Sequence, residues 1–208
     1  ISGKSITYGD SSMIAADIER IRWGISSTIT NGVETESSFS FVVGKANAEL
    51  SVQCGKRGIF TAVKGIFQKT SPHFGADGLL VWQTRSGDVV PISDLSSWEQ
   101  NKCFEMMIDA ACHHLLPSLI SRILERLEAG KSVDIGPCKL NKDTISFHAG
   151  YIRRKEHHLP WRNVETSMES GEVIVLDRNK RKTRVSMYAR TTDNAVILPR
   201  ICATLSNQ

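Results

Sequence analysis

A long helical pattern between residues 94 and 129 separates two stretches of the chain that both favour β-structure. Ser96 and Glu99 form a capping box near its start, and Gly130 suits the position after its last turn. Pro117 falls in the middle, where its ring removes a backbone hydrogen bond, so we expect the helix to kink or to split there. The apolar residues that recur at helical spacing are Phe104, Met107, Ile108, Ala111, Leu115, Leu119, Ile123 and Leu127.

The stretches on either side of this helix contain short apolar or alternating runs between Gly, Asn and Asp turn signals, which is typical of strands. Before the helix, the expected strands are Ser5–Tyr8, Ile18–Ile29, Phe39–Val43, Ala48–Gln53, Gly58–Phe67, Leu79–Thr84 and Val89–Ile92. After it, they are Ser132–Leu140, Thr144–Ala149, His158–Met168, Glu172–Leu176 and Thr183–Arg190. A last apolar helix is expected near Asn194–Leu205, and it begins at Pro199 or before it, since proline suits a first helical turn.

The order of these elements is strands, helix, strands, helix, which predicts an α+β fold rather than alternating βαβ units. The same order occurs twice. We therefore expect two units in tandem, each a small antiparallel sheet or partial barrel closed by a C-terminal helix. The first unit is expected to cover residues 1–129, including the long helix, and the second residues 130–208.

A meandering antiparallel sheet closed by one amphipathic helix resembles the pleckstrin-homology-like (PH-like) fold. The region of roughly residues 124–205 is similar to a bacterial PH-like family, in which a Pro-Trp pair introduces a strand and an Asn-started helix closes the barrel. The matching segments are LEAGKSVDIG (127–136), KLNKDTISF (139–147), LPWRNVETSMESGEVIVLD (159–177) and DNAVILPRICATL (193–205). The resemblance implies two PH-like units in tandem. PH-like domains include lipid binders, peptide binders and scaffolds, so the fold alone selects no function.

Composition excludes several classes of protein. The chain has 208 residues, 40% apolar and 23% charged, which does not fit a disordered, collagen-like or membrane-embedded chain. Its first residue is Ile1 rather than Met, so we expect that an upstream segment has been removed. Five widely spaced cysteines without a C-x-x-C motif favour reduced thiols in the cytoplasm; they are Cys54, Cys103, Cys112, Cys138 and Cys202. We expect a cytoplasmic protein that can also lie peripherally at the inner membrane face.

Positive charge is concentrated near the C-terminal end of the chain. Residues 151–190 hold ten Lys and Arg against five Asp and Glu, although the net charge of the whole chain is only +4. Two expected loops carry most of these cations, and convergence of the loops would create a site for an anionic surface. Loops at opposite ends of the sheet would instead be ordinary solvated surface. The candidate ligand-binding residues are Arg153, Arg154, Lys155, Arg178, Lys180, Arg181 and Lys182.

No pattern with a catalytic mechanism is present, since the chain lacks the nucleophile elbow and the Gly-rich phosphate loops. Glu105, Asp109 and His113 lie one turn apart on the expected helix, and carboxylate and imidazole groups bind metals. No second helix offers matching ligands, so we expect a solvated face there. The basic stretch has few interleaved aromatic residues, which makes nucleic acid a less favoured partner than lipid or protein. We therefore expect no catalytic residue, cofactor or metal.

These observations predict a non-enzymatic binding or regulatory module that engages an anionic surface, either membrane headgroups or an acidic protein, through basic hairpin loops. An alternative is a protein-interaction scaffold that recruits a peptide or a subunit at a sheet edge or in a groove beside the long helix. A hydrolase or metal enzyme built around Asp109 and His113 is a third hypothesis. The residues leave the identity of the ligand and the oligomeric state open.

Overall fold

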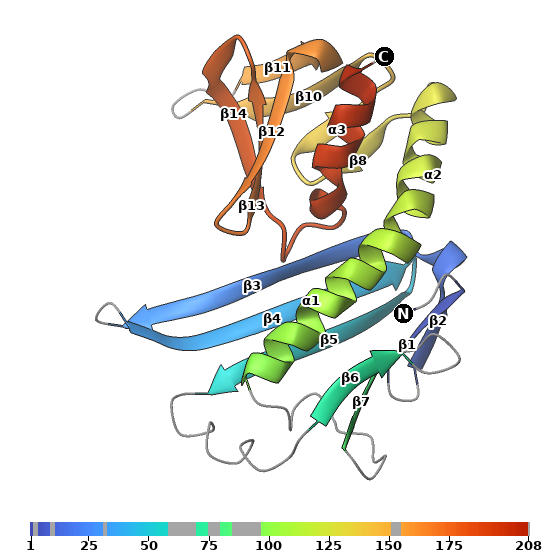
Figure 1. The fold of residues 1–208 in the computed structure, drawn as a ribbon. Coiled ribbons are helices and arrows are strands. Elements are labelled where there is room, and N and C mark those ends of the chain that lie inside the picture. The colour runs from blue at the N-terminus through green and yellow to red at the C-terminus, as the bar shows by residue number, and fades with distance from the viewer. Residues whose placement is uncertain are drawn as a thin grey trace. The chain divides into compact units, whose positions relative to one another are not determined.

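The computed structural model describes residues 1, 4–8, 11–30, 33–57, 70–74, 80–84, 97–150 and 155–207. Within these residues the protein is α+β, with several small antiparallel sheets and three α-helices, the last of which lies at the C-terminal end of the chain (Figure 1). The sheets are separate in this part of the chain and do not form a closed barrel. The predicted α+β layout is therefore confirmed.

Contacts divide the chain into two compact units. Unit 1 comprises Ile1–Glu19 and Gly24–Leu116, and unit 2 comprises Arg20–Trp23 and Pro117–Gln208. The expected boundary between residues 129 and 130 differs from this division, because the second half of the long helical pattern belongs to unit 2. Unit 2 also takes a short segment from the start of the chain.

Unit 1 is built from hairpins and one three-stranded sheet. Helix α1 (Ser97–His114) lies against strand β4, where Phe104 stacks on Phe39 with ring centroids 5.2 Å apart (Figure 1). Stacked aromatic pairs contribute about 0.5–1.5 kcal/mol beyond their buried area. The strands are β1 (Ser5–Tyr8) with β2 (Ser11–Ile14), β3 (Arg20–Thr30) with β4 (Val33–Lys45) and β5 (Ala48–Arg57), and β6 (Thr70–Phe74) with β7 (Leu80–Thr84). The first four residues of β3 belong to unit 2. A short 3-10 helix, η1 (Ala15–Asp17), follows β2.

Pro117 splits the long helix, as the sequence predicts. Helix α1 ends at His114, and helix α2 (Leu116–Glu128) has Pro117 as its second residue. The first turn of a helix tolerates proline because its N–H groups have no intrahelical acceptor. The buried side of α2 repeats at helical spacing, with Leu116, Leu119, Ile123 and Leu127.

Unit 2 contains two antiparallel sheets and the C-terminal helix. Helix α3 (Leu198–Ser206) lies beside strand β12 (Val164–Glu169) in Figure 1, and it also contacts the 3-10 helix η5 (Trp161–Asn163). It buries Ile201, Cys202 and Leu205. The first sheet has β8 (Val133–Ile135), β9 (Cys138–Leu140), β10 (Thr144–Ala149) and β11 (Lys155–Pro160). The second has β12 (Val164–Glu169), β13 (Glu172–Asp177) and β14 (Lys180–Tyr188). The remaining short elements are η5 (Trp161–Asn163) and η6 (Ala195–Ile197).

The expectation of one continuous strand over His158–Met168 is wrong. The strand stops at Pro160, and η5 intervenes before β12 begins at Val164. Trp161 is the physical reason, because its side chain is only 5% exposed and its Nε1–H donates to the carbonyl oxygens of two residues in a nearby turn. Burying this ring requires the chain to turn at residue 161.

Two other expectations change in detail, and three more lie outside the described residues. The strand expected over Ser132–Leu140 is a hairpin of β8 and β9 with its turn at Gly136 and Pro137. The C-terminal helix begins at Leu198, directly before Pro199, and η6 precedes it. The strands expected at Gly58–Phe67 and Val89–Ile92, and the cap expected at Ser96, fall outside the residues that the structure describes.

Two glycines with positive φ provide a test of packing in unit 2. Gly136 has φ +54°, and a Cβ there would lie 2.7 Å from Cγ2 of Thr192, whereas Gly130 has φ +74° and open space around it. We expect Gly130→Ala to cost about 1 kcal/mol through its left-handed backbone. Gly136→Ala adds a steric clash and should cost about 2–4 kcal/mol in total. Urea denaturation measures both values, and equal losses would contradict this account of the β8–β9 turn.

Candidate functional site

The candidate cations divide among three places in the chain. Arg178, Lys180, Arg181 and Lys182 are all exposed in the hairpin of β13 and β14. Lys155 is exposed at the first position of β11. Arg153 and Arg154 lie outside the described residues, so the structure bears on five of the seven.

The tip of the β13–β14 hairpin is held by hydrogen bonds at the backbone. The Asp177 carboxylate, in a residue only 8% exposed, accepts the N–H of Asn179 at 2.9 Å. The N–H of Arg178 donates to the carbonyl of Asn163 at 2.8 Å, and its guanidinium donates to the carbonyl of Val164 at 3.4 Å. The turn is thus fixed against the start of β12, and its cations extend from an ordered backbone.

A bulge follows this turn and redirects the next cations. Asp177 pairs with Lys180, but Leu176 pairs with Arg184, so residues 181–183 have no partner on β13. Such bulges increase the local twist of a strand and change the direction of its side chains. Arg181 and Lys182 both lie in the bulge and are exposed.

Positive charge in the hairpin has little local compensation. Residues 177–184 contain five cations and one carboxylate, that of Asp177. Arg181 lies 3.5 Å from the Glu165 carboxylate, but these side chains are 77% and 38% exposed, and such surface pairs contribute little. Within the described parts of the chain, no carboxylate comes within 4.0 Å of Lys180, Lys182 or Arg184.

Trp161 brings two more cations to the same end of unit 2. Its indole N–H donates to the carbonyls of Asn141 and Lys142, at 3.2 and 2.9 Å, and the next residue, Arg162, is exposed. Because η5 also accepts the N–H of Arg178 through Asn163, three separate segments meet here. We call the exposed cations on these three segments the basic end; they are Lys142, Arg162, Arg178, Lys180, Arg181 and Lys182.

Sequence reasoning missed Lys142 and Arg162 because each is a single cation far from the hairpin along the chain. The signal that was available is the Pro160–Trp161 pair, whose large ring needs a buried position and an acceptor for its N–H. Lys155 does not share this position: it begins β11, and the strand's length, about 17 Å, separates it from the segment that contacts Arg178.

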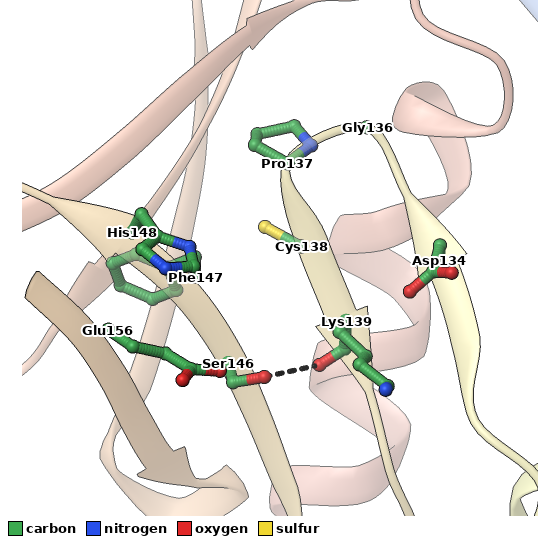
Figure 2. A pocket seen from close by; sticks show the side chains of 9 residues that line it. All are labelled: Asp134, Gly136, Pro137, Cys138, Lys139, Ser146, Phe147, His148 and Glu156. Atoms are coloured by element: carbon green, nitrogen blue, oxygen red, sulfur yellow. Dashed lines mark hydrogen bonds between the residues drawn. The ribbon is translucent and has the colours of Figure 1, made fainter. Parts of the chain in front are cut away.

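A second candidate lies on the exposed side of the β8–β11 sheet. A pocket of about 190 Å³ lies there, and its lining includes Asp134, Lys139, Ser146, His148 and Glu156. Figure 2 shows these side chains. Alternation along antiparallel strands places these side chains on one surface together with His158, and we call this surface the polar face. The Ser146 hydroxyl, in a residue 4% exposed, donates to the Lys139 carbonyl at 3.5 Å (Figure 2).

The polar face carries groups of both signs. Asp134 is directly opposite Lys139 across β8 and β9, and His148 is directly opposite Glu156 across β10 and β11. Glu156 also lies 3.6 Å from Nε2 of His158. A face that mixes groups of both signs produces a smaller net potential than a cluster of one sign, such as the basic end.

The buried thiols of unit 2 are poor nucleophiles. Burial raises the pKa of Cys138 to about 12, and burial together with the neighbouring Cys138 raises the pKa of Cys202 to about 12. The thiolate is the reactive form of cysteine, so both residues stay protonated and inert near neutral pH. Their role is packing between β9 and α3.

The helical stripe considered as a metal site stays on the surface. Glu105, Asp109 and His113 are all exposed on α1. Across the part of the chain that the structure describes, no group of three or more His, Cys, Asp or Glu side chains is arranged to hold a metal ion. No described helix combines the length and apolar character needed to cross a bilayer.

Comparison with known proteins finds no match to a family model, to a curated protein or to a solved structure. The PH-like resemblance therefore stays a prediction from the sequence. The candidate sites are interpreted from their own geometry.

Raised thiol pKa values predict selective protection from alkylation. At pH 8 we expect iodoacetamide to modify half-buried Cys112 first, and Cys138 and Cys202 only after denaturation. The two protected thiols should react roughly three orders of magnitude more slowly than a thiol of ordinary pKa, since the thiolate fraction falls tenfold for each unit by which the pKa rises. Peptide mapping by mass spectrometry measures this order. Rapid native labelling of Cys138 would contradict the buried position of β9.

The same shifts predict a loss of stability at high pH. Above about pH 9 the unfolded chain releases these two protons, while the folded protein keeps them until about pH 12. The folded state then binds more protons than the unfolded state, so the free energy of unfolding falls as pH rises through this interval. Urea midpoints measured between pH 8 and pH 10.5 test this direction, with Cys138→Ala reducing the slope.

Proposed function

We propose that this protein is a non-enzymatic binding module that attaches peripherally to the anionic inner face of a membrane through the basic end of unit 2. The observation that carries this proposal is the set of exposed cations on an ordered hairpin, of which only Arg181 has a carboxylate within 4.0 Å among the described residues. Uncompensated charge raises the local concentration of an anionic partner.

The exposure of these cations favours a diffuse surface contact. Lysine ammonium groups are mobile point charges, which suit an array of headgroups better than one planar ligand. Each cation near an anionic leaflet contributes about 1 kcal/mol, so the four hairpin residues contribute about 4 kcal/mol, which is a millimolar affinity. Lys142 and Arg162 add to this. Binding is therefore weak, salt-sensitive and suited to a protein with a second membrane contact.

We also propose a fold assignment for the two units. In unit 2 the strands β8–β14 are antiparallel to their neighbours and α3 follows them, and in unit 1 the strands precede α1. This order supports an interpretation as two PH-like units in tandem. The position of the basic end, at the tip of a hairpin, supports an anion-binding role for the second unit.

Charge reversal in the hairpin tests the proposal directly. We expect the triple variant K180E/R181E/K182E to bind phosphatidylserine-containing vesicles at least 100-fold more weakly, because about 3 kcal/mol of attraction is lost. Arg178 is left intact, since it donates to Val164 and holds the turn. Co-sedimentation with anionic and with neutral vesicles, at low and at physiological salt, measures the effect.

A matched control changes the same amount of charge elsewhere in unit 2. R126E/K131E/R200E alters three exposed cations outside the basic end and should retain most of the binding. If both triple variants lost vesicle binding equally, the binding would depend on the net charge of the protein, which would contradict a site at the hairpin. Absence of wild-type binding at low salt would overturn the membrane proposal and favour a protein partner.

Glu165 provides a gain-of-binding test. Its carboxylate lies 3.5 Å from the Arg181 guanidinium and competes with an external anion. We expect Glu165→Gln to strengthen vesicle binding by about two- to fivefold, which corresponds to a surface ion pair. Glu169→Gln, at the other end of β12, is the control and should change binding less because of screening. Weaker binding by Glu165→Gln would show that the carboxylate positions Arg181 rather than competing for it.

A further inference from the structure

Asp193 and Asn194 hold a segment of unit 2 that comes from the opposite end of the chain. The N–H of Asn194 donates to the carbonyl of Ile21 at 2.8 Å, and the N–H of Ile21 donates back to Oδ1 of Asn194 at 3.0 Å. Both backbone polar groups of Ile21 thus bond to Asn194, as they would bond to a residue of a neighbouring strand. We call Asp193 and Asn194 the clamp, and Arg20–Trp23 the clamped segment.

The backbone of the clamp is shaped for this contact. Asn194 has φ +62°, a left-handed conformation that costs about 1–2 kcal/mol in most non-glycine residues and that Asn tolerates best. This conformation allows the N–H and the side-chain oxygen of one residue to bond the same partner residue. The two hydrogen bonds offset the strain.

The clamp also recognises side chains. Oδ1 of Asp193 lies 2.6 Å from Nη1 of Arg22, and its Oδ2 lies 3.9 Å from Nη1 of Arg20. Ile21, between the two arginines, is completely buried. The clamp therefore fits an extended segment with the pattern arginine, apolar residue, arginine.

The clamped segment is the first part of strand β3, and the rest of that strand belongs to unit 1. Glu19 before it and Gly24 after it both belong to unit 1, and the rest of unit 2 begins at Pro117. The clamp residue Asp193 is 171 positions from Arg22 along the chain. Another chain that presents the same four residues would make the same contacts, and a second copy of this protein presents them by definition.

We propose that the clamp is an interaction site for an extended Arg-apolar-Arg segment, and that in trans it takes the clamped segment of a second copy, giving a dimer by segment exchange. This inference is independent of the basic end. Within one chain, the clamp and the clamped segment are held close together, so their effective concentration is high. This contact within the chain (the cis contact) therefore predominates in dilute solution, where the protein is monomeric. Exchange becomes dominant when the cis contact is weakened and the trans contact is not.

Two charge-reversal variants create that situation. R22D places an aspartate beside Asp193, and D193R places an arginine beside Arg22, so each chain alone has a repulsive clamp. In an exchanged heterodimer of R22D with D193R, one clamp joins the two introduced side chains, an aspartate at position 22 and an arginine at position 193. The other clamp joins the two native residues, Arg22 and Asp193. At both clamps of the mixed dimer, positions 22 and 193 then carry opposite charges, while the bonds between Asn194 and Ile21 stay available.

Native mass spectrometry and sedimentation velocity of the full chains measure the outcome. We expect the equimolar mixture to form a 1:1 heterodimer, with dimer association roughly tenfold or more stronger than in either variant alone. The double variant R22D/D193R restores an opposite-charge pair in cis and should behave as the wild type. Its vesicle binding should also match the wild type, which separates this test from the proposed function.

Co-expression of the two variants keeps the proposal testable if either one fails to fold alone. Recovery of a 1:1 complex from co-expressing cells would support exchange. A mixture that stays monomeric although both variants unfold cooperatively, or co-expression that yields no 1:1 complex, would overturn it and leave the clamp as an intramolecular contact only.

Discussion

The arrangement of unit 2 depends on one buried N–H group, that of the Trp161 indole. The residue is 5% exposed, and its Nε1–H donates to the carbonyls of Asn141 and Lys142. A buried donor without an acceptor costs about 1–3 kcal/mol, so the ring can lie only where these turn carbonyls meet it. The Trp161 carbonyl in turn accepts the hydroxyl of Ser206 at the end of α3. The turn after β9, the start of β12 and the last helix are thus positioned by the same residue.

Electrostatics distinguishes the two surfaces that this arrangement creates. On the polar face, antiparallel register places opposite charges across from one another, as with Asp134 and Lys139. In the β13–β14 hairpin the bulge interrupts the register after Leu176, so Arg181 and Lys182 have no cross-strand partner. Cross-strand pairing compensates charge in a regular sheet. Its local loss leaves a net positive charge exposed at the hairpin.

Local chemistry explains which elements could be predicted from the sequence. Pro117 divides the long helix because proline lacks the N–H of a helix interior, and this effect needs no distant contact. The strand over Thr144–Ala149 was predicted with its observed bounds from short-range pattern alone. The error over His158–Met168 has the opposite origin. The apolar residues before Trp161 continue the strand pattern up to that ring, and the strand stops there because the indole N–H bonds to an acceptor far away in the sequence.

The sequence by itself determined the α+β layout, the split helix and the concentration of cations between β13 and β14, because periodicity, proline and net charge are properties of neighbouring residues. Only the tertiary structure decided that Lys142 and Arg162 join this hairpin while Lys155 begins the far end of β11. It also decided that Ile21 bonds to Asn194. Such contacts join segments up to 173 residues apart, and they form where buried polar groups find partners, which no local pattern encodes.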